Sequence, residues 1–236
     1  MRFATGVFAG MVLALSSGLV SGAQSGAQAV AAAKPAEVSF QFDRPGVPVP
    51  RFTLRVKENG TGSYEADEVQ GPADGGAVQY VAPKHIERVL DLSEPTVTKI
   101  FKAARELSRF DVQCEAKAKN IANTGKKTLA YAGADGSGSC TYNYSDNKDI
   151  QMLTNTFTAI AFTLDEGRRL AFLHRYDRLG LDAEMIQLQR EAAAGQALEL
   201  NTIAAELSSI AGDTAIMQRV RTQAARLLEQ AGSNKI

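Results

Sequence analysis

The two cysteines of this chain bracket one segment, residues 114–140, with the sequence CEAKAKNIANTGKKTLAYAGADGSGSC. A zinc site would need four ligands at short local spacings, and the segment has no C-x-x-C motif. The two histidines, His85 and His174, are far from either cysteine in the sequence. We therefore predict no metal or cofactor. We predict instead a disulfide bond between Cys114 and Cys140, with Cα atoms roughly 4.4–6.8 Å apart.

Three short runs around the two cysteines alternate between apolar and polar residues, as half-buried strands do. They lie at 110–114, 127–131 and 140–144. Turn signals rich in Asn, Asp and Gly separate them, at 123–126 and 135–138. The cysteines would then join the outer strands of a small antiparallel meander.

Upstream of this segment, further alternating runs predict additional strands, at 38–42, 52–56, 63–66 and 78–81. A helix over about 94–109 should follow them. Ser93 can cap this helix, and Pro95 is tolerated in its first turn.

Downstream of the segment, only helical periodicity is found. From residue 149 onward, apolar residues recur at spacings of three and four, beginning with Ile150, Leu153, Phe157, Ile160 and Leu164. Glycines divide this whole region, residues 149–236, into four or five helices. We interpret the apolar stripes as the core of a helical bundle, because packing of such a face is what stabilises a helix.

Together these patterns predict an α+β protein with two parts. The first, residues 38–148, is an antiparallel β-sheet domain with one packing helix and one disulfide. The second, residues 149–236, is an α-helical region.

The N-terminal sequence has the pattern of a secretory signal peptide. Arg2 precedes an apolar stretch without charged residues, and small-x-small sites follow that would allow cleavage after Ala23 or Ala29. We predict a signal peptide over 1–23 and a flexible leader over 24–37. An uncleaved membrane anchor is the alternative. The mature protein is expected to be extracytoplasmic, periplasmic or secreted, without a stable membrane anchor.

The charge balance argues against a nucleic-acid partner. The chain has 26 basic and 26 acidic residues, and neither part has a basic excess. One local cluster of lysines is a candidate anion-binding patch: Lys117, Lys119, Lys126 and Lys127. The alternative is a protected sheet edge, because lysines blunt the edges of strands.

Established catalytic motifs are absent from the sequence: there is no G-x-S-x-G, H-E-x-x-H, P-loop or G-x-G-x-x-G after a strand. The nearest candidate is a polar cluster of His174, Asp177 and Arg178, which fall within about one helical turn. An acid–base role would need partners from elsewhere in the chain. A polar helix face with i,i+3 pairing is the simpler interpretation.

We therefore expect an exported, non-catalytic protein with a binding or scaffold role, and another extracytoplasmic protein is a candidate partner. The alternative hypothesis is an extracytoplasmic hydrolase-type enzyme. Its dispersed site would lie near His174, Asp177 and Arg178.

Overall fold

The structure is a computed structural model that describes residues 34–69, 82–118 and 120–233. Some of the predicted features lie outside these ranges: the signal peptide over 1–23, most of the leader over 24–37, and the strand over 78–81. They remain predictions.

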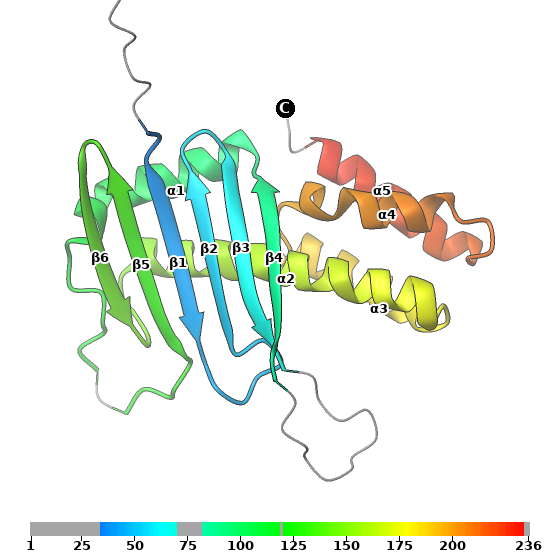
Figure 1. The fold of residues 1–236 in the computed structure, drawn as a ribbon, viewed down its shortest axis with the longest axis horizontal. Coiled ribbons are helices and arrows are strands. Elements are labelled where there is room, and N and C mark those ends of the chain that lie inside the picture. Colours follow the sequence, from blue (N-terminus) through cyan, green and yellow to red (C-terminus); the bar gives the residue numbers. More distant parts are fainter. Residues whose placement is uncertain (1–33, 70–81, 119, 234–236) are drawn as a thin grey trace, which may run out of the picture. The chain divides into compact units, whose positions relative to one another are not determined.

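Six strands form one antiparallel sheet in the spatial order β4-β3-β2-β1-β5-β6 (Figure 1). Their bounds are β1 Glu37–Asp43, β2 Arg51–Lys57, β3 Thr61–Glu68, β4 Lys84–Asp91, β5 Lys126–Gly133 and β6 Gly136–Tyr142. The predicted alternation is confirmed in the central strands. Along β2, for example, Phe52, Leu54 and Val56 are buried, whereas the residues between them are partly exposed.

The predicted strand over 110–114 is wrong, whereas the other two strands of the predicted meander are confirmed as the antiparallel pair β5 and β6. The chain there forms a 3-10 helix, η1 (Ser108–Phe110), in which all three residues have positive φ. Cys114 follows in an irregular segment. The disulfide itself is confirmed, with the Cα atoms of Cys114 and Cys140 5.9 Å apart. It fastens this irregular segment to β6. Strand β5 pairs with β6 on one side, where Leu129 lies opposite Cys140, and with β1 on the other.

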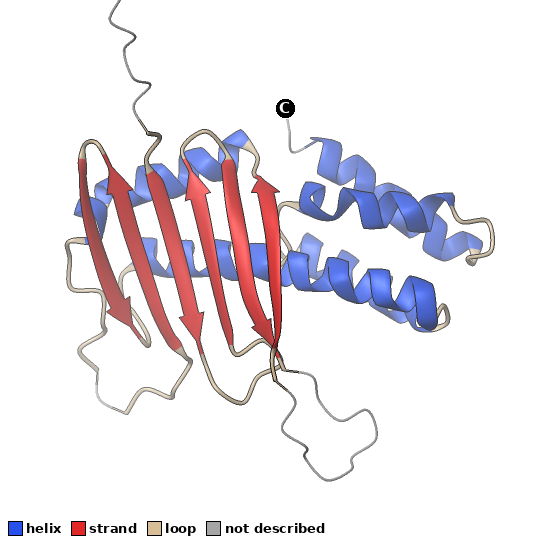
Figure 2. Cartoon of the chain, in the orientation of Figure 1, coloured by secondary structure: helices blue, strands red, loops and turns tan. Residues whose placement is uncertain are grey.

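The helices are α1 Glu94–Glu106, α2 Lys148–Tyr176, α3 Gly180–Ala193, α4 Ala204–Gly212 and α5 Gln218–Ser233, with a 3-10 helix η2 at Leu200–Ile203. Figure 2 shows α1 and α2 behind the same face of the sheet. The structure therefore confirms the α+β class, with an antiparallel sheet followed by a helical region. Among the described residues, none of the helices combines the length and the apolar character needed to span a bilayer.

Helix α2 contributes to two apolar cores. Its first half packs with α1 on the sheet, where the ring of Phe157 stacks on that of Phe40 with the centroids 5.2 Å apart. From Leu170 onward it packs against α3, α4 and α5. Gly167 lies between the two cores, and a Cβ atom there would lie 2.3 Å from Cγ2 of Ile203. Glycine therefore allows η2 to pass close to α2.

The N-terminus of α1 is capped from a distant part of the chain. Ser93 occupies the N-cap position as expected, but its own side chain makes no capping bond. Instead, the buried Glu199 carboxylate accepts hydrogen bonds from the Ser93 amide (2.8 Å), the Ser93 hydroxyl (2.6 Å) and the Thr96 hydroxyl. A carboxylate at this helix end is also favoured by the helix dipole. Glu199 thus links the segment before η2 to the sheet-packing helix.

Candidate functional site

A groove of about 1020 Å³ lies between the β1–β2 loop, the start of β4 and the middle of α2. Its volume is typical of ligand sites, which are mostly apolar with a few placed polar groups. The apolar part of its lining comes from Val47, Val49, Ile86, Phe162 and Phe172. The charged part comes from β3, β4 and α2, which bring together residues about 100 positions apart in the sequence.

At one wall of the groove, Arg168 contacts two carboxylates, an arrangement that we call the arginine fork. Arg168 on α2 donates from Nη2 to Asp165 Oδ1 (2.9 Å) and from Nη1 to Glu68 Oε2 at the end of β3 (2.7 Å). The Tyr64 hydroxyl also donates to Asp165 Oδ1 (2.9 Å). This network joins the sheet to α2. It is a positioning element, since each carboxylate is satisfied by groups of the protein.

Burial dominates the titration of this network. It raises the pKa of Asp165, an effect opposed by the hydrogen bonds from Arg168 and Tyr64. Burial also raises the pKa of Tyr64, and the neighbouring Asp165 carboxylate raises it further. Tyr64 is therefore a neutral hydrogen-bond donor at physiological pH.

A second carboxyl group of the groove, Glu166, is 8 % exposed and lies beside the equally buried Glu184 of α3. Burial raises the pKa of Glu166 to about 8, and its hydrogen bond to Glu184 adds to this. Arg169 Nε lies 2.8 Å from Glu184 Oε2. At neutral pH Glu166 therefore retains its proton.

On the β4 side of the groove, Arg88 and His85 are also paired within the protein. Arg88 Nη1 lies 3.1 Å from Glu206 Oε1 of α4. The His85 ring contacts Asp67 through Nδ1 (2.9 Å) and Glu87 through Nε2 (3.3 Å), and the hydrogen bond with Asp67 raises the pKa of His85. The groove thus combines apolar residues with arginines that are paired with carboxylates of the protein.

The structure brings His174 and Arg178 of the predicted polar cluster together at Asp213, whereas Asp177 makes a separate contact. His174 Nε2 lies 2.9 Å from Asp213 Oδ2, and Arg178 Nη2 lies 3.9 Å from the same oxygen. Asp177 instead accepts a hydrogen bond from the amide of Gly180 at the start of α3. None of the predicted three lines the groove. They tie the end of α2 to its neighbours.

The predicted lysine patch is also divided. Lys127 is buried, and its Nζ donates to the carbonyls of Thr124, Gly125 and Asn143, so it holds a turn together. Lys117 and Lys126 are exposed. Lys119 lies outside the described residues. The anion-binding patch remains a prediction.

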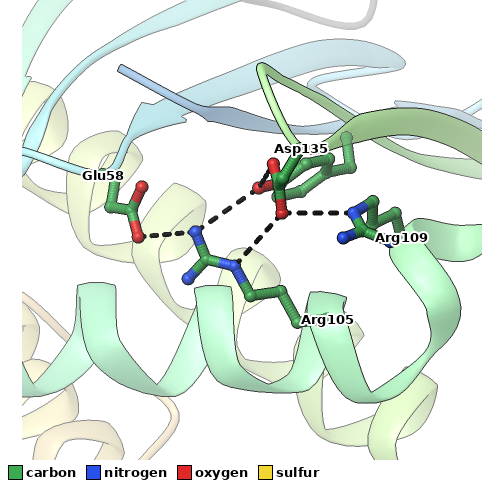
Figure 3. A network of polar contacts seen from close by, with 5 residues as sticks. Glu58, Arg105, Arg109 and Asp135 are labelled. Carbon is green, nitrogen blue, oxygen red and sulfur yellow. Dashed lines mark hydrogen bonds and ion pairs between the residues drawn. The ribbon is translucent and has the colours of Figure 1, made fainter. Parts of the chain in front are cut away.

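A further polar network joins α1 to the β5–β6 hairpin (Figure 3). The Asp135 carboxylate accepts a hydrogen bond from the Tyr131 hydroxyl (2.7 Å) and one from Arg109 Nε (3.2 Å). Arg105 lies between Asp135 and Glu58, 2.7 Å from the Glu58 carboxylate. The Tyr131 hydrogen bond is the main reason for the lowered pKa of Asp135. These exposed pairs position the hairpin.

In the described part of the chain, no three His, Cys, Asp or Glu side chains are grouped so as to hold a metal ion. No known family model matches the chain, and no curated protein matches its sequence.

Proposed function

We propose that the chain is an exported, non-catalytic binding protein, and that the groove binds an apolar group presented by another extracytoplasmic protein. The observation that carries this proposal is the composition of the groove. Its apolar residues come from three elements, and its arginines are held by internal carboxylates. A cleft whose arginines are already paired with carboxylates favours apolar contact over the capture of an anionic group.

The same pairing argues for binding over catalysis. A catalytic acid or base must reach its substrate with the correct protonation state. Here the Arg168 network and the Glu166–Glu184 pair instead link α2 to β3 and to α3, where they maintain the shape of the groove.

Export is the second part of the proposal. It rests on the signal-peptide pattern of the sequence, and a disulfide bond is compatible with an oxidising compartment. We expect the mature protein to begin at Gln24 or at Val30. Sequencing of the N-terminus of protein recovered from the extracytoplasmic fraction checks this. An intact Met1 in the membrane fraction would contradict it.

Filling the groove should abolish apolar binding. Thr158 lines the groove and is exposed, so Thr158→Phe adds a ring to the groove without enlarging the core. We expect the variant to bind the neutral fluorescent probe N-phenyl-1-naphthylamine about tenfold more weakly than the wild type, because the ring competes for the same apolar surface. Fluorescence titration measures the affinity.

Asn155→Phe is the matched control, since Asn155 is an exposed residue of the same helix that does not line the groove. It should bind the probe as the wild type does. Equal loss in both variants, or no loss in either, would contradict the assignment of the groove. Any partner recovered with the wild-type protein should be lost with Thr158→Phe alone.

A further inference from the structure

The exposed apolar side chains of the molecule are unevenly distributed. Among the described residues, eight large apolar side chains are exposed. Four of them lie at the end of α2 and in the two turns beside it: Phe172, Tyr176, Leu179 and Met217, with exposed fractions of 59 %, 65 %, 83 % and 39 %. We name these four residues the distal cluster. Clustered exposed apolar groups mark interaction sites.

Helical spacing and one polar contact bring the distal cluster together. Phe172 and Tyr176 are one turn apart on α2, and their ring centroids are 5.1 Å apart. The contact between His174 and Asp213 joins the last turn of α2 to the α4–α5 connection, which contains Met217. Figure 1 shows the α2–α3 and α4–α5 turns at the same end of the helices, away from the sheet.

Arginines accompany the distal cluster. Arg175 is exposed, and its guanidinium lies 5.3 Å from the Tyr176 ring centroid. Arg178 is also exposed and lies 3.9 Å from Asp213, whose carboxylate is held at 2.9 Å by His174. The acid of the α2–α3 turn, Asp177, is exposed and accepts a hydrogen bond from the amide of Gly180. Aromatic and aliphatic side chains beside arginines are typical of segments that lie in the interface of an anionic membrane.

We propose that the distal cluster docks the protein reversibly on an anionic lipid surface. The apolar side chains would enter the interfacial region, and Arg175 and Arg178 would contact lipid phosphates. A stable protein interface buries about 800 Å² on each partner. The distal cluster supplies only four side chains for such an interface, whereas a membrane accepts a small inserted cluster. The site adjoins the groove, because Phe172 also lines the groove, but it does not depend on the function proposed for the groove.

Vesicle sedimentation of the exported, full-length mature protein tests the proposal. Vesicles of phosphatidylcholine with about one third phosphatidylglycerol should bind the protein, and pure phosphatidylcholine vesicles should bind it several-fold more weakly. The double variant Tyr176→Ser/Leu179→Ser should lose about tenfold in binding to the anionic vesicles. Both residues are exposed, so the fold should persist, which circular dichroism checks.

Val89→Ser is the matched control, because Val89 is 90 % exposed but lies on β4. It should bind the anionic vesicles as the wild type does. Arg175→Gln/Arg178→Gln should remove the preference for the anionic vesicles. The proposal is overturned if the wild type ignores anionic vesicles, if it binds both vesicle types equally, or if Tyr176→Ser/Leu179→Ser binds unchanged. Self-association through the distal cluster without vesicle binding would overturn it in favour of a second copy of the chain.

Discussion

Replacing Arg168 with alanine should lower the free energy of unfolding by about 2–3 kcal/mol, because it leaves the Asp165 and Glu68 carboxylates without their shared cation. Asp165 is held in a partly buried position by Tyr64, so it cannot move into water without breaking that hydrogen bond as well. Urea denaturation at pH 7 measures the change. Probe binding in the groove should weaken too, since the fork joins β3 to α2.

The matched control is Arg55→Ala. Arg55 forms an ion pair with Glu65 between neighbouring strands, but both side chains are more than one third exposed. Exposed pairs of this kind contribute only about 0–1 kcal/mol. An equal loss in the free energy of unfolding for Arg168→Ala and Arg55→Ala would show that the Arg168 network stabilises the fold no more than an exposed ion pair does.

Replacing Glu166 with glutamine should stabilise the protein at alkaline pH and have little effect at acidic pH. The folded-state pKa of Glu166 is raised to about 8, above its ordinary value of 4.5. Between these values Glu166 therefore binds more protons in the folded state than in the unfolded state, and its contribution to stability falls as the pH rises from about 4.5 through 8. Glutamine resembles the protonated acid and has no proton to lose.

The stability difference between Glu166→Gln and the wild type should grow by roughly 2–4 kcal/mol between pH 5 and pH 9, and then level off. Thermal melts across this range measure it. Glu229→Gln, which changes an exposed carboxylate on α5, should show no comparable growth. A difference that is constant with pH would mean that Glu166 is ionised in the folded protein at neutral pH.

The charged residues that α2 contributes to the groove stand out in the sequence. The helical stripe of α2 is interrupted by Asp165-Glu166-Gly167-Arg168-Arg169, a run of charges within a helix that is otherwise apolar on one side. Charges at buried positions of a helix require partners from other elements. The partners could not be named from the sequence, because Glu68, Tyr64 and Glu184 belong to elements whose packing is not encoded in local spacing.

Strand β4 could not be predicted from local sequence either. Its inward positions carry Lys84, Ile86, Arg88 and Leu90, so only half of them are apolar and the alternation is too weak to predict a strand. Arg88 tolerates its inward position because it forms an ion pair with Glu206 of α4.

The strand predicted at 110–114 failed although its alternation was clear. Its alternation resembles that of a strand, but three successive residues with positive φ turn the chain into η1.

The sequence by itself determined the features that depend on local periodicity and pairing chemistry. These are the central strands, the long α2 helix, and the disulfide between the two cysteines. The tertiary structure alone decided that β1 lies beside β5, and that Glu199 instead of Ser93 caps α1. It also placed α2 beside β3 to form the groove. The physical reason is that the local backbone of a helix or strand sets the spacing at which its side chains face the core. The partner of a buried charge or of a free amide is instead set by packing between distant segments.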